Sequence, residues 1–351
     1  MNIASQAATA ARCRFPRLVV SSVVLLTLAT ACSGGGDDGE LGAGGGRTTT
    51  TAPKFFPLTG LAADSPTTVT RQAITVKIEN SPASRPQAGL DKADVVYEAV
   101  VEGGQTRFLA VFHSTDADQI GPVRSVRPTD PSIVDPFGGI VAYSGGIPRF
   151  VEAMKATGLT NYDETTAGDA FRRRRDKSAP HNLYTSTGSL YSKGPHAAAP
   201  PKFAEFLPPG QAFAPAGATP VAGFSLAIGS STRADFAWDA ASSTWKRSTN
   251  GAAHNAEGGG QLAPDTVIVQ FVPYEGTGEV DTTGAQVSEA KVIGSGEATI
   301  FAGGVMVRAR WSKPNSQAMT AWTDLAGAPI ALPAGRTWVE LPATGTALTT
   351  R

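Results

Sequence analysis

Alternating apolar and polar residues mark several short strands in the first half of the chain. Such alternation occurs from Ala73 to Glu79, from Asp94 to Glu102 and from Thr106 to His113, and successive side chains of a strand point to opposite faces. Gly103-Gly104 stands between the last two segments and supplies the backbone conformation of a tight turn. We therefore predict an antiparallel hairpin over residues 94–113, together with a strand at 73–79.

Two further patterns follow in this half. Ile140 to Tyr143 is a short apolar run that ends near Gly145-Gly146, which predicts another strand followed by a turn. Arg149 to Thr157 has apolar residues at helical spacing and stops before Gly158, as is typical of a helix C-terminus. Strands and a helix in one segment indicate an α+β N-terminal domain with a mixed or antiparallel sheet.

The second half of the chain carries strand patterns at intervals of about 8–12 residues, separated by turn sequences such as Asn250-Gly251. The predicted strands are Gly223 to Ile228, Ala234 to Asp239, Ser243 to Ser248, Thr266 to Tyr274, Val287 to Val292, Glu297 to Phe301, Val305 to Trp311 and Thr337 to Leu341. They predict a mostly β C-terminal domain, built as a sandwich or a curled sheet.

Two segments lack the apolar density that a packed element needs. Residues 33–54 are rich in Gly and Thr, and residues 209–220 are rich in Pro, Gly and Ala. We therefore predict the following division of the chain: a signal peptide at 1–31, a disordered tether at 32–54, an N-terminal domain at 55–208, a linker at 209–220 and a C-terminal domain at 221–345.

The amino-terminal segment has the pattern of a secretory signal. Arg12, Arg14 and Arg17 precede an apolar run from Leu18 to Ala31, which is too short for a membrane-spanning helix. Cys32 follows at once, and the residues before it resemble a bacterial lipobox. We expect Cys32 to be the lipid-modified first residue of the mature protein, anchored at the extracytoplasmic face of the cell membrane.

Composition narrows the classes of function. The chain has 30 basic and 30 acidic residues, and nucleic-acid binding usually requires a strongly basic domain, so we expect no nucleic-acid partner. Cleavage before Cys32 would remove Cys13, so lipidation would leave no thiol for a disulfide or for cysteine chemistry. The four histidines are scattered and show no metal-ligand spacing. We therefore expect neither a metal nor a cofactor.

Motifs in collinear order carry a resemblance to a known family. They are PLTGL at 57–61, IENSPASRPQAGLDKADVVYEAVVEGGQTRFLAVF at 78–112, GPVRSVRP at 121–128, SGG at 144–146, APHNLYTS at 179–186, GGQLAPDTVIVQFV at 259–272, GSGEATIF at 294–301, WSKP at 311–314 and LPAGRTWVELP at 332–342. The chain resembles the YerB-like family of bacterial lipoproteins over nearly its whole mature length. The resemblance implies an envelope lipoprotein with two domains and no established activity. Ser144 stands where the family more often has His.

Charged residues of the predicted hairpin form the first candidate site. Glu98 and Glu102 share one face of their strand, and a turn of two or four residues would bring Arg107 onto that face, whereas an odd turn would place Phe108 there. Two carboxylates beside a guanidinium shift one another's pKa values, as at many functional sites. At about 13 Å apart along a strand, however, they are too distant for a glycosidase acid/base pair. A cross-strand charge pair on a solvated face is the alternative.

Four arginines in apolar or Pro/Gly-rich surroundings form the second candidate site. They are Arg85, Arg107, Arg124 and Arg127. A guanidinium suits carboxylate and phosphate ligands, and loops held by a scaffold often carry binding residues. We expect an anionic ligand at these arginines; internal salt bridges that fix the loops are the alternative.

His181 is the best single candidate for catalysis. It follows a proline and precedes Asn182, which could fix the imidazole ring so that it acts as a general base. The sequence has no GxSxG or HExxH motif that would supply a partner. A structural histidine and a ligand contact are the alternatives.

Three functions remain open. We favour a lipid-anchored cell-envelope protein that binds an anionic cell-wall peptide or phosphate-bearing polymer, rather than an enzyme. Its predicted ligand-binding residues are Arg85, Glu98, Glu102, Arg107, Arg124, Arg127, His181 and Asn182. The first alternative is an envelope hydrolase that acts on cell-wall material with His181 or Glu102 as general base. The second is a scaffold partner that docks a membrane enzyme through the β domain.

Overall fold

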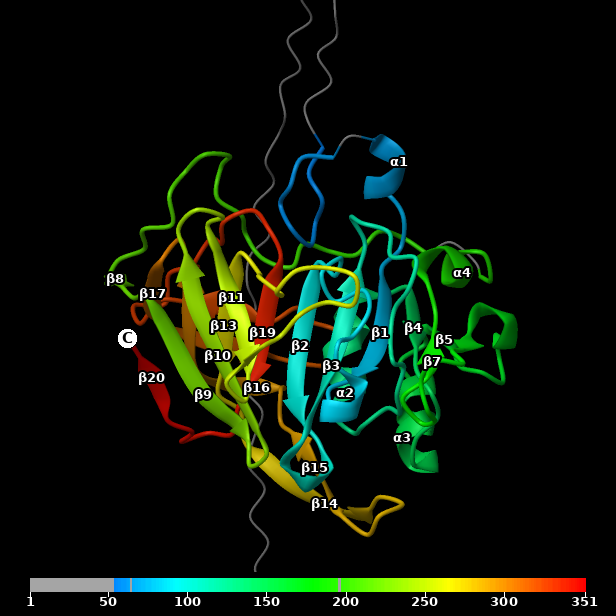
Figure 1. The fold of residues 1–351 in the computed structure, drawn as a ribbon. Helices are drawn as coiled ribbons and strands as arrows, with labels where there is room; N and C mark the ends of the chain where they lie inside the picture. Colours follow the sequence, from blue (N-terminus) through cyan, green and yellow to red (C-terminus); the bar gives the residue numbers. More distant parts are fainter. Residues whose placement is uncertain (1–53, 64, 195–196) are drawn as a thin grey trace, which may run out of the picture. The chain divides into compact units, whose positions relative to one another are not determined.

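A computed structural model describes residues 54–63, 65–194 and 197–351 of the chain. The predicted signal peptide, Cys32 and nearly all of the predicted tether lie outside these residues. The described fold is mostly β, with short helices between the strands (Figure 1). Among the described helices, none has the length and apolar character needed to cross a membrane.

One large mixed sheet runs through the described residues. Its strands, in spatial order, are β18 (Ala321–Thr323), β17 (Val305–Lys313), β16 (Gly294–Ala302), β13 (Thr266–Gln270), β19 (Thr337–Leu341), β2 (Val95–Val100), β3 (Thr106–Phe112), β1 (Ile74–Glu79), β4 (Ile140–Ala142) and β5 (Thr160–Tyr162). The short strand β8 (Thr219–Pro220) pairs with the beginning of β17. The strands predicted at 73–79, 94–102 and 106–113 correspond to β1, β2 and β3, and each strand predicted in the second half has a counterpart.

The two halves of the sequence meet in the middle of this sheet. β19, from the second half, pairs in parallel with β2, from the first, so that Val339 lies beside Tyr97. Residues Ala52–Arg351 accordingly form one compact unit. The linker predicted at 209–220 thus connects two segments that share a sheet, and the division into two domains stays a prediction.

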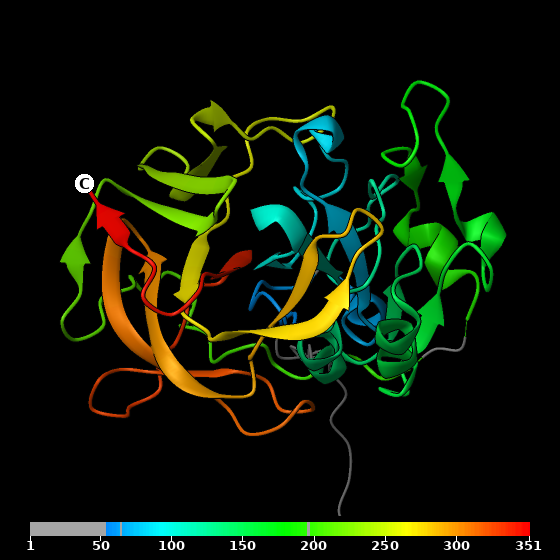
Figure 2. The same ribbon diagram turned by 90° about the horizontal axis from the view of Figure 1, so that it is seen from below.

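A second sheet covers one face of the large sheet. Its five strands, in spatial order, are β12 (Ala252–Ala253), β11 (Thr244–Thr249), β10 (Thr232–Asp239), β9 (Gly223–Gly229) and β20 (Leu348–Thr350). Between the sheets, Phe224 stacks on Phe301 with ring centroids 3.7 Å apart, and Trp245 packs against both rings. Figure 2 shows this layer at one end of the large sheet, with the segment around residues 150–195 at the other end.

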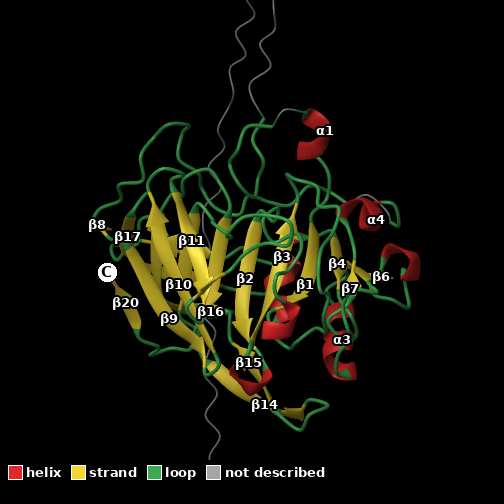
Figure 3. Cartoon of the chain, viewed as in Figure 1, coloured by secondary structure: helices red, strands yellow, loops and turns green. Residues whose placement is uncertain are grey.

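The opposite face of the large sheet is covered by short helices and a two-stranded ribbon. The helices are α2 (Asp130–Val134) and α3 (Pro148–Lys155), and the ribbon pairs β14 (Tyr274–Val280) with β15 (Gln286–Ala290) (Figure 3). The helix predicted at 149–157 corresponds to α3. The other elements are α1 (Pro66–Val69), α4 (Thr187–Tyr191), β6 (Arg172–Arg173), β7 (Leu183–Tyr184) and 3₁₀ turns at Pro82–Ser84, Glu102–Gly104, Asp135–Phe137 and Gly168–Ala170.

The turn of the predicted hairpin has three residues, Glu102–Gly104, and both of its glycines have positive φ. A backbone hydrogen bond between the flanking residues closes it. An odd turn length places Phe108 opposite Glu98, while Arg107 projects from the other face of the sheet. The charged residues of the hairpin therefore do not share one face.

Three neighbouring parallel strands, β1, β4 and β5, end at the same edge of the large sheet. Gly139 permits β4 to start close to β1, because its φ is 73° and a Cβ at this position would clash with the carbonyl oxygen of Ala73. Ligands of open sheets commonly bind beyond the carboxyl ends of parallel strands. A ligand site is therefore expected at this edge.

Candidate functional site

Polar residues gather where β1, β4 and β5 end. Glu79 is the last residue of β1, and Ser144 and Glu164 each follow the end of their strand by two residues. The loop of Arg124 packs alongside, since the Arg124 N–H donates to the Lys77 carbonyl oxygen at 2.9 Å. The edge cluster is defined as Glu79, Arg124, Ser144, Glu164, Arg173, His181 and Asn182.

One carboxylate oxygen of Glu79 contacts both a histidine and an arginine. Nδ1 of His181 lies 2.8 Å from Oε2, and Nε of Arg124 lies 3.5 Å from the same atom. The other oxygen, Oε1, accepts a hydrogen bond from the Ser81 hydroxyl at 2.9 Å. The Glu79 side chain is 6% exposed, against 26% for His181 and 22% for Arg124. A buried carboxylate therefore fixes an imidazole and a guanidinium that both reach solvent.

A second set of contacts leads back to the same loops. The Ser144 hydroxyl donates to Oε2 of Glu164 at 3.2 Å, and Glu164 pairs with Arg173 at 2.8 Å. Arg173 then donates from Nη1 to Oδ1 of Asn182 at 2.9 Å. The Ser144 N–H donates to the Arg124 carbonyl oxygen at 2.9 Å. Because Asn182 follows His181, the contacts close a ring through loops that are distant in the sequence.

The edge cluster carries both signs of charge, two arginines against two glutamates. Behind it lies Arg107, which is buried and donates from Nη1 to the Ser125 carbonyl oxygen at 3.0 Å. Burial, and then repulsion from Arg127 and Arg124, lowers the pKa of Arg107 to about 10. At neutral pH this group is still a cation, and its field favours an anion near the cluster.

Arg127 and Glu102, two of the predicted ligand-binding residues, pair with each other. Nη2 of Arg127 donates to Oε2 of Glu102 at 2.7 Å, and its Nε donates to Oε1. The two side chains are 9% and 5% exposed. Both carboxylate oxygens of the candidate base Glu102 thus accept hydrogen bonds from the Arg127 guanidinium. This geometry is an internal salt bridge, the alternative to ligand binding for this pair.

Glu98 lies on the opposite face of the sheet, in a buried cluster between the two sheets. It accepts hydrogen bonds from Nδ2 of Asn80 at 3.0 Å and from Nη2 of Arg247 at 2.6 Å. Arg247 also donates from Nη1 to Oε1 of Glu340 at 2.7 Å. Arg85 donates to Oδ1 of Asn80 at 3.0 Å, so it reaches the neighbour of Glu98 rather than the edge cluster.

Two acidic groups share one guanidinium in this interior cluster. Burial, and then repulsion from Glu98, raises the pKa of Glu340 well above its ordinary value. Burial, and then repulsion from Arg247, lowers the pKa of His254 well below its ordinary value. Nε2 of His254 lies 2.8 Å from Oε1 of Gln87. The interior cluster therefore ties residues of the first half to residues of the second.

Sequence reasoning did not single out Glu79 or Arg247. Glu79 ends a predicted strand and lies two residues after Lys77, so two charges on one face of an apolar strand were the available signal. Arg247 lies two residues after Trp245 in another predicted strand. An arginine on the same face as a tryptophan of the core indicates a charge that points inward.

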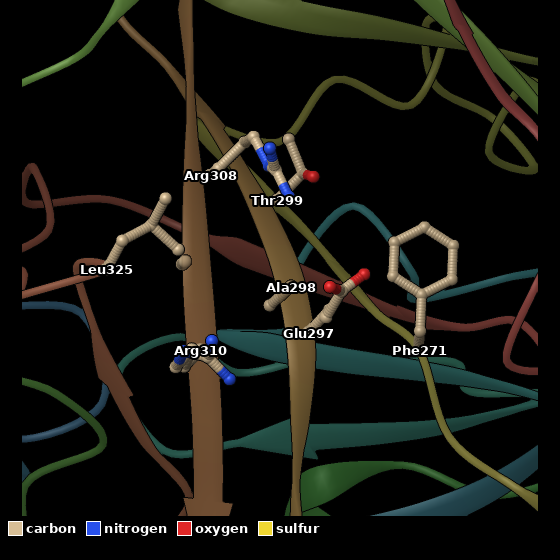
Figure 4. Close-up of a pocket in the computed structure, with 8 residues that line it drawn as sticks. Phe271, Glu297, Ala298, Thr299, Arg308, Arg310 and Leu325 are labelled. Atoms are coloured by element: carbon tan, nitrogen blue, oxygen red, sulfur yellow. The ribbon is translucent and has the colours of Figure 1, made fainter. Parts of the chain in front are cut away.

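A separate hollow lies on the large sheet between β16 and β17 (Figure 4). In register, Thr299 lies opposite Arg308 and Glu297 opposite Arg310, and Leu325 stands at its side. None of the residues predicted as ligand-binding lines this hollow. Within the described part of the chain, no group of three or more His, Cys, Asp or Glu residues is placed to hold a metal ion.

Two family models match the chain. The N-terminal domain of a protein of unknown function, DUF3048, matches residues 58–199, and its C-terminal domain matches residues 224–339. The chain belongs to the DUF3048 family. The resemblance to YerB-like proteins is confirmed by a curated relative and by a solved structure of that name.

Two relatives of this DUF3048 protein match different shares of the chain. A protein of Bacillus subtilis (strain 168) named "Putative lipoprotein YerB" is 39% identical over 133 residues, which is 37% of this chain and 39% of that protein. The matched region thus spans well under half of the relative's length. The crystal structure of YerB protein from Bacillus subtilis has a TM-score of 0.70 at 21% identity, covering 84% of this chain and 99% of that chain. The two proteins share a fold.

Proposed function

We propose that this DUF3048 protein is an envelope lipoprotein whose edge cluster binds an anionic group of cell-wall material. A lipid on Cys32 would hold the protein at the extracytoplasmic face of the membrane. The basic and apolar pattern before Cys32 supports this anchor, and the Bacillus subtilis relative carries the word lipoprotein in its name. Carboxylates of wall peptides and phosphates of wall polymers are the anions expected there.

The guanidinium of Arg124, whose side chain is 22% exposed, carries the proposal. Its buried Nε faces Oε2 of Glu79 at 3.5 Å. Its Nη1 makes only a long contact, 3.4 Å, with the Pro180 carbonyl oxygen. A guanidinium binds carboxylate or phosphate through two parallel hydrogen bonds. The Nη groups of Arg124 retain donors for such a group, and the imidazole of His181 is held beside them by the same carboxylate.

The proposal retains part of the predicted set. Arg124, His181 and Asn182 belong to the edge cluster. Arg173 adds a second guanidinium, and its side chain is 49% exposed. The remaining predicted residues hold internal partners that a ligand would have to displace: Arg85, Glu98, Glu102, Arg107 and Arg127.

Binding to isolated wall material, measured at two salt concentrations, tests this function. Arg124→Gln should weaken binding about tenfold or more, because a hydrogen bond to a charged group contributes about 1.5–3 kcal/mol. Higher salt should weaken the binding of the wild type as well. Arg308→Gln is the matched control, since this exposed arginine of β17 lies outside the edge cluster. Equal binding by both variants and the wild type would refute the edge cluster as the binding site.

An envelope hydrolase is a second candidate, favoured by one observation. Buried Glu79 holds Nδ1 of His181, a side chain that is 26% exposed, as in an oriented general base. The nearby Ser144 hydroxyl donates to Glu164, so a water molecule is the nucleophile that this histidine would activate.

Release of soluble fragments from purified wall material separates the two candidates. A hydrolase should release fragments, and His181→Gln should abolish the release while the circular-dichroism spectrum stays that of the wild type. Binding without any release favours the first function. Release that survives His181→Gln would exclude this residue as the base.

A further inference from the structure

Exposed apolar side chains gather at the edge of the large sheet where β1 begins, which we name the entry edge. The large apolar side chains most exposed among the described residues are Phe55, Leu61, Val280, Ile293 and Leu325. Phe55 and Leu61 belong to the loop whose Phe56 ring lies 5.6 Å from His113, the residue after β3, and β3 ends where β1 begins. Leu325 follows β18. This strand runs opposite to β1, so it ends at the entry edge. Three of the five most exposed large apolar side chains, Phe55, Leu61 and Leu325, therefore lie toward the entry edge.

An apolar groove of about 280 Å³ lies at the entry edge. It is lined chiefly by Phe55, Phe56, Phe206, Pro208 and Pro209. A second hollow shares Leu207 with the groove, and a third shares Asp324 with the second and is bordered by Leu325. The three hollows thus adjoin one another from the first described residues to the loop after β18.

The chain itself indicates what covers this surface. Residues 33–53 alone separate Cys32 from the first described residue, Lys54, which lies beside the groove. The tether that the sequence predicts over this length would have a root-mean-square reach of about 25 Å. Lys202 lines the groove and pairs with the exposed Glu205 at 3.3 Å, and Lys54 directly precedes the lining residue Phe55. The charge beside the groove is therefore basic on balance.

We propose that the entry edge is a membrane-contacting surface, which rests on the lipid anchor of the proposed function. Phe55 and Leu61 enter the boundary between headgroups and acyl chains, and the two lysines face anionic headgroups. The six residues of β1 separate the entry edge from the edge cluster by about 20 Å. Contact at the entry edge consequently directs Arg124 and His181 away from the membrane, toward the wall.

Quenching by nitroxide-labelled lipids tests the contact in the lipidated mature protein, reconstituted in phosphatidylglycerol/phosphatidylcholine vesicles. The only cysteines of the sequence are Cys13 and Cys32, so a fluorophore can be placed through Leu61→Cys alone. Val280→Cys is the matched control, because Val280 is 47% exposed against 44% for Leu61 and lies on the ribbon at the far edge (Figure 1). Insertion of about 5–10 Å should quench about half or more of the fluorescence at position 61 and little at position 280. Equal quenching at both positions, or none at either, would overturn the inference.

A second arm separates this inference from the anchor. Flotation of the lipidated Phe55→Ser plus Leu61→Ser protein with vesicles reports on the anchor without the entry edge, and its failure would count against the proposed function. The mature chain with Cys32→Ser, which carries no lipid, should still bind phosphatidylglycerol vesicles weakly. Phe55→Ser plus Leu61→Ser should abolish that binding, whereas Val280→Ser plus Ile293→Ser should preserve it. No vesicle binding by the Cys32→Ser chain, or equal loss in both double variants, would overturn the inference even if the anchor holds.

Discussion

Replacing Arg247 by Met perturbs the interior cluster that joins the two sheets. The guanidinium is 0% exposed and pairs with Glu98 at 2.6 Å and with Glu340 at 2.7 Å, so methionine leaves two buried carboxyl groups without their counter-charge. Removing one partner of a buried ion pair costs about 3–5 kcal/mol. For a domain of this size, about 2–4 °C of Tm is lost per kcal/mol. We therefore expect Tm to fall by about 6–20 °C.

This loss of stability should depend on pH. Burial and repulsion from Glu98 raise the pKa of Glu340, so the folded state keeps that proton to higher pH than the unfolded chain. The stability linked to this proton is present at low pH and is lost as the pH rises through the folded-state pKa. Arg247 lowers the pKa of Glu340, so without it the Glu340 carboxyl holds its proton still more firmly. The difference between variant and wild type should therefore be larger at pH 8 than at pH 5.

Thermal and urea denaturation followed by circular dichroism at both pH values measures these differences. Arg233→Met is the matched control, because Arg233 on β10 is 56% exposed and pairs with Asp235 at 3.0 Å. An exposed pair contributes about 0–1 kcal/mol. If Arg247→Met lost no more stability than Arg233→Met, the interior cluster would not hold the two halves together as inferred.

Three further substitutions test other parts of the structure. Gly139→Ala should destabilise the protein far more than Gly138→Ala, because both residues have positive φ but only at 139 would a Cβ meet the neighbouring backbone; equal falls in Tm would contradict this. Glu340→Gln should keep or raise the stability at pH 8, since it removes a carboxyl that burial disfavours as an anion; a large loss in urea denaturation would refute the raised pKa. Burial lowers the pKa of His113 to about 4, so the unfolded chain takes up this proton first and stability is lost as the pH falls from about 6.5 toward 4. His113→Asn has no imidazole at this position, so the stability of the wild type relative to the variant should drop as the pH falls over that range. A constant difference in stability would contradict the lowered pKa of His113.

The hairpin at residues 94–113 shows how far a local pattern reaches. Both strands and the glycine turn followed from alternation and turn chemistry, and they match β2 and β3. The face of Arg107 depended on the length of the turn, which became odd because Glu102 joined it. The carboxylate of Glu102 pairs with Arg127, 25 residues away. The alternation of residues within one hairpin cannot predict that contact.

His181 shows the same limit at the candidate site. The sequence indicated a histidine with a fixed ring and suggested Asn182 as the residue that fixes it. In the structure the ring is held by Glu79, which is 102 residues away. The two meet because β1 ends at the edge of the large sheet against which the loop before β7 packs, and that arrangement depends on strand pairing over long separations. The parallel pairing of β19 with β2, which merges the two halves in one sheet, was hidden for the same reason.

Isothermal titration calorimetry most directly tests the binding of an anionic wall group by Arg124. The titrants are a wall stem peptide with a free terminal carboxylate, the same peptide amidated, and a phosphate-bearing wall-polymer fragment. We predict that the wild type binds at least one of the two anionic ligands, that Arg124→Gln weakens this binding about tenfold or more, and that Arg308→Gln leaves it unchanged. If the peptide is the ligand, amidation of its carboxylate should weaken binding to the wild type by a similar factor. Equal affinity of the wild type and Arg124→Gln for the anionic ligands, or no binding of either ligand, would contradict the proposed site.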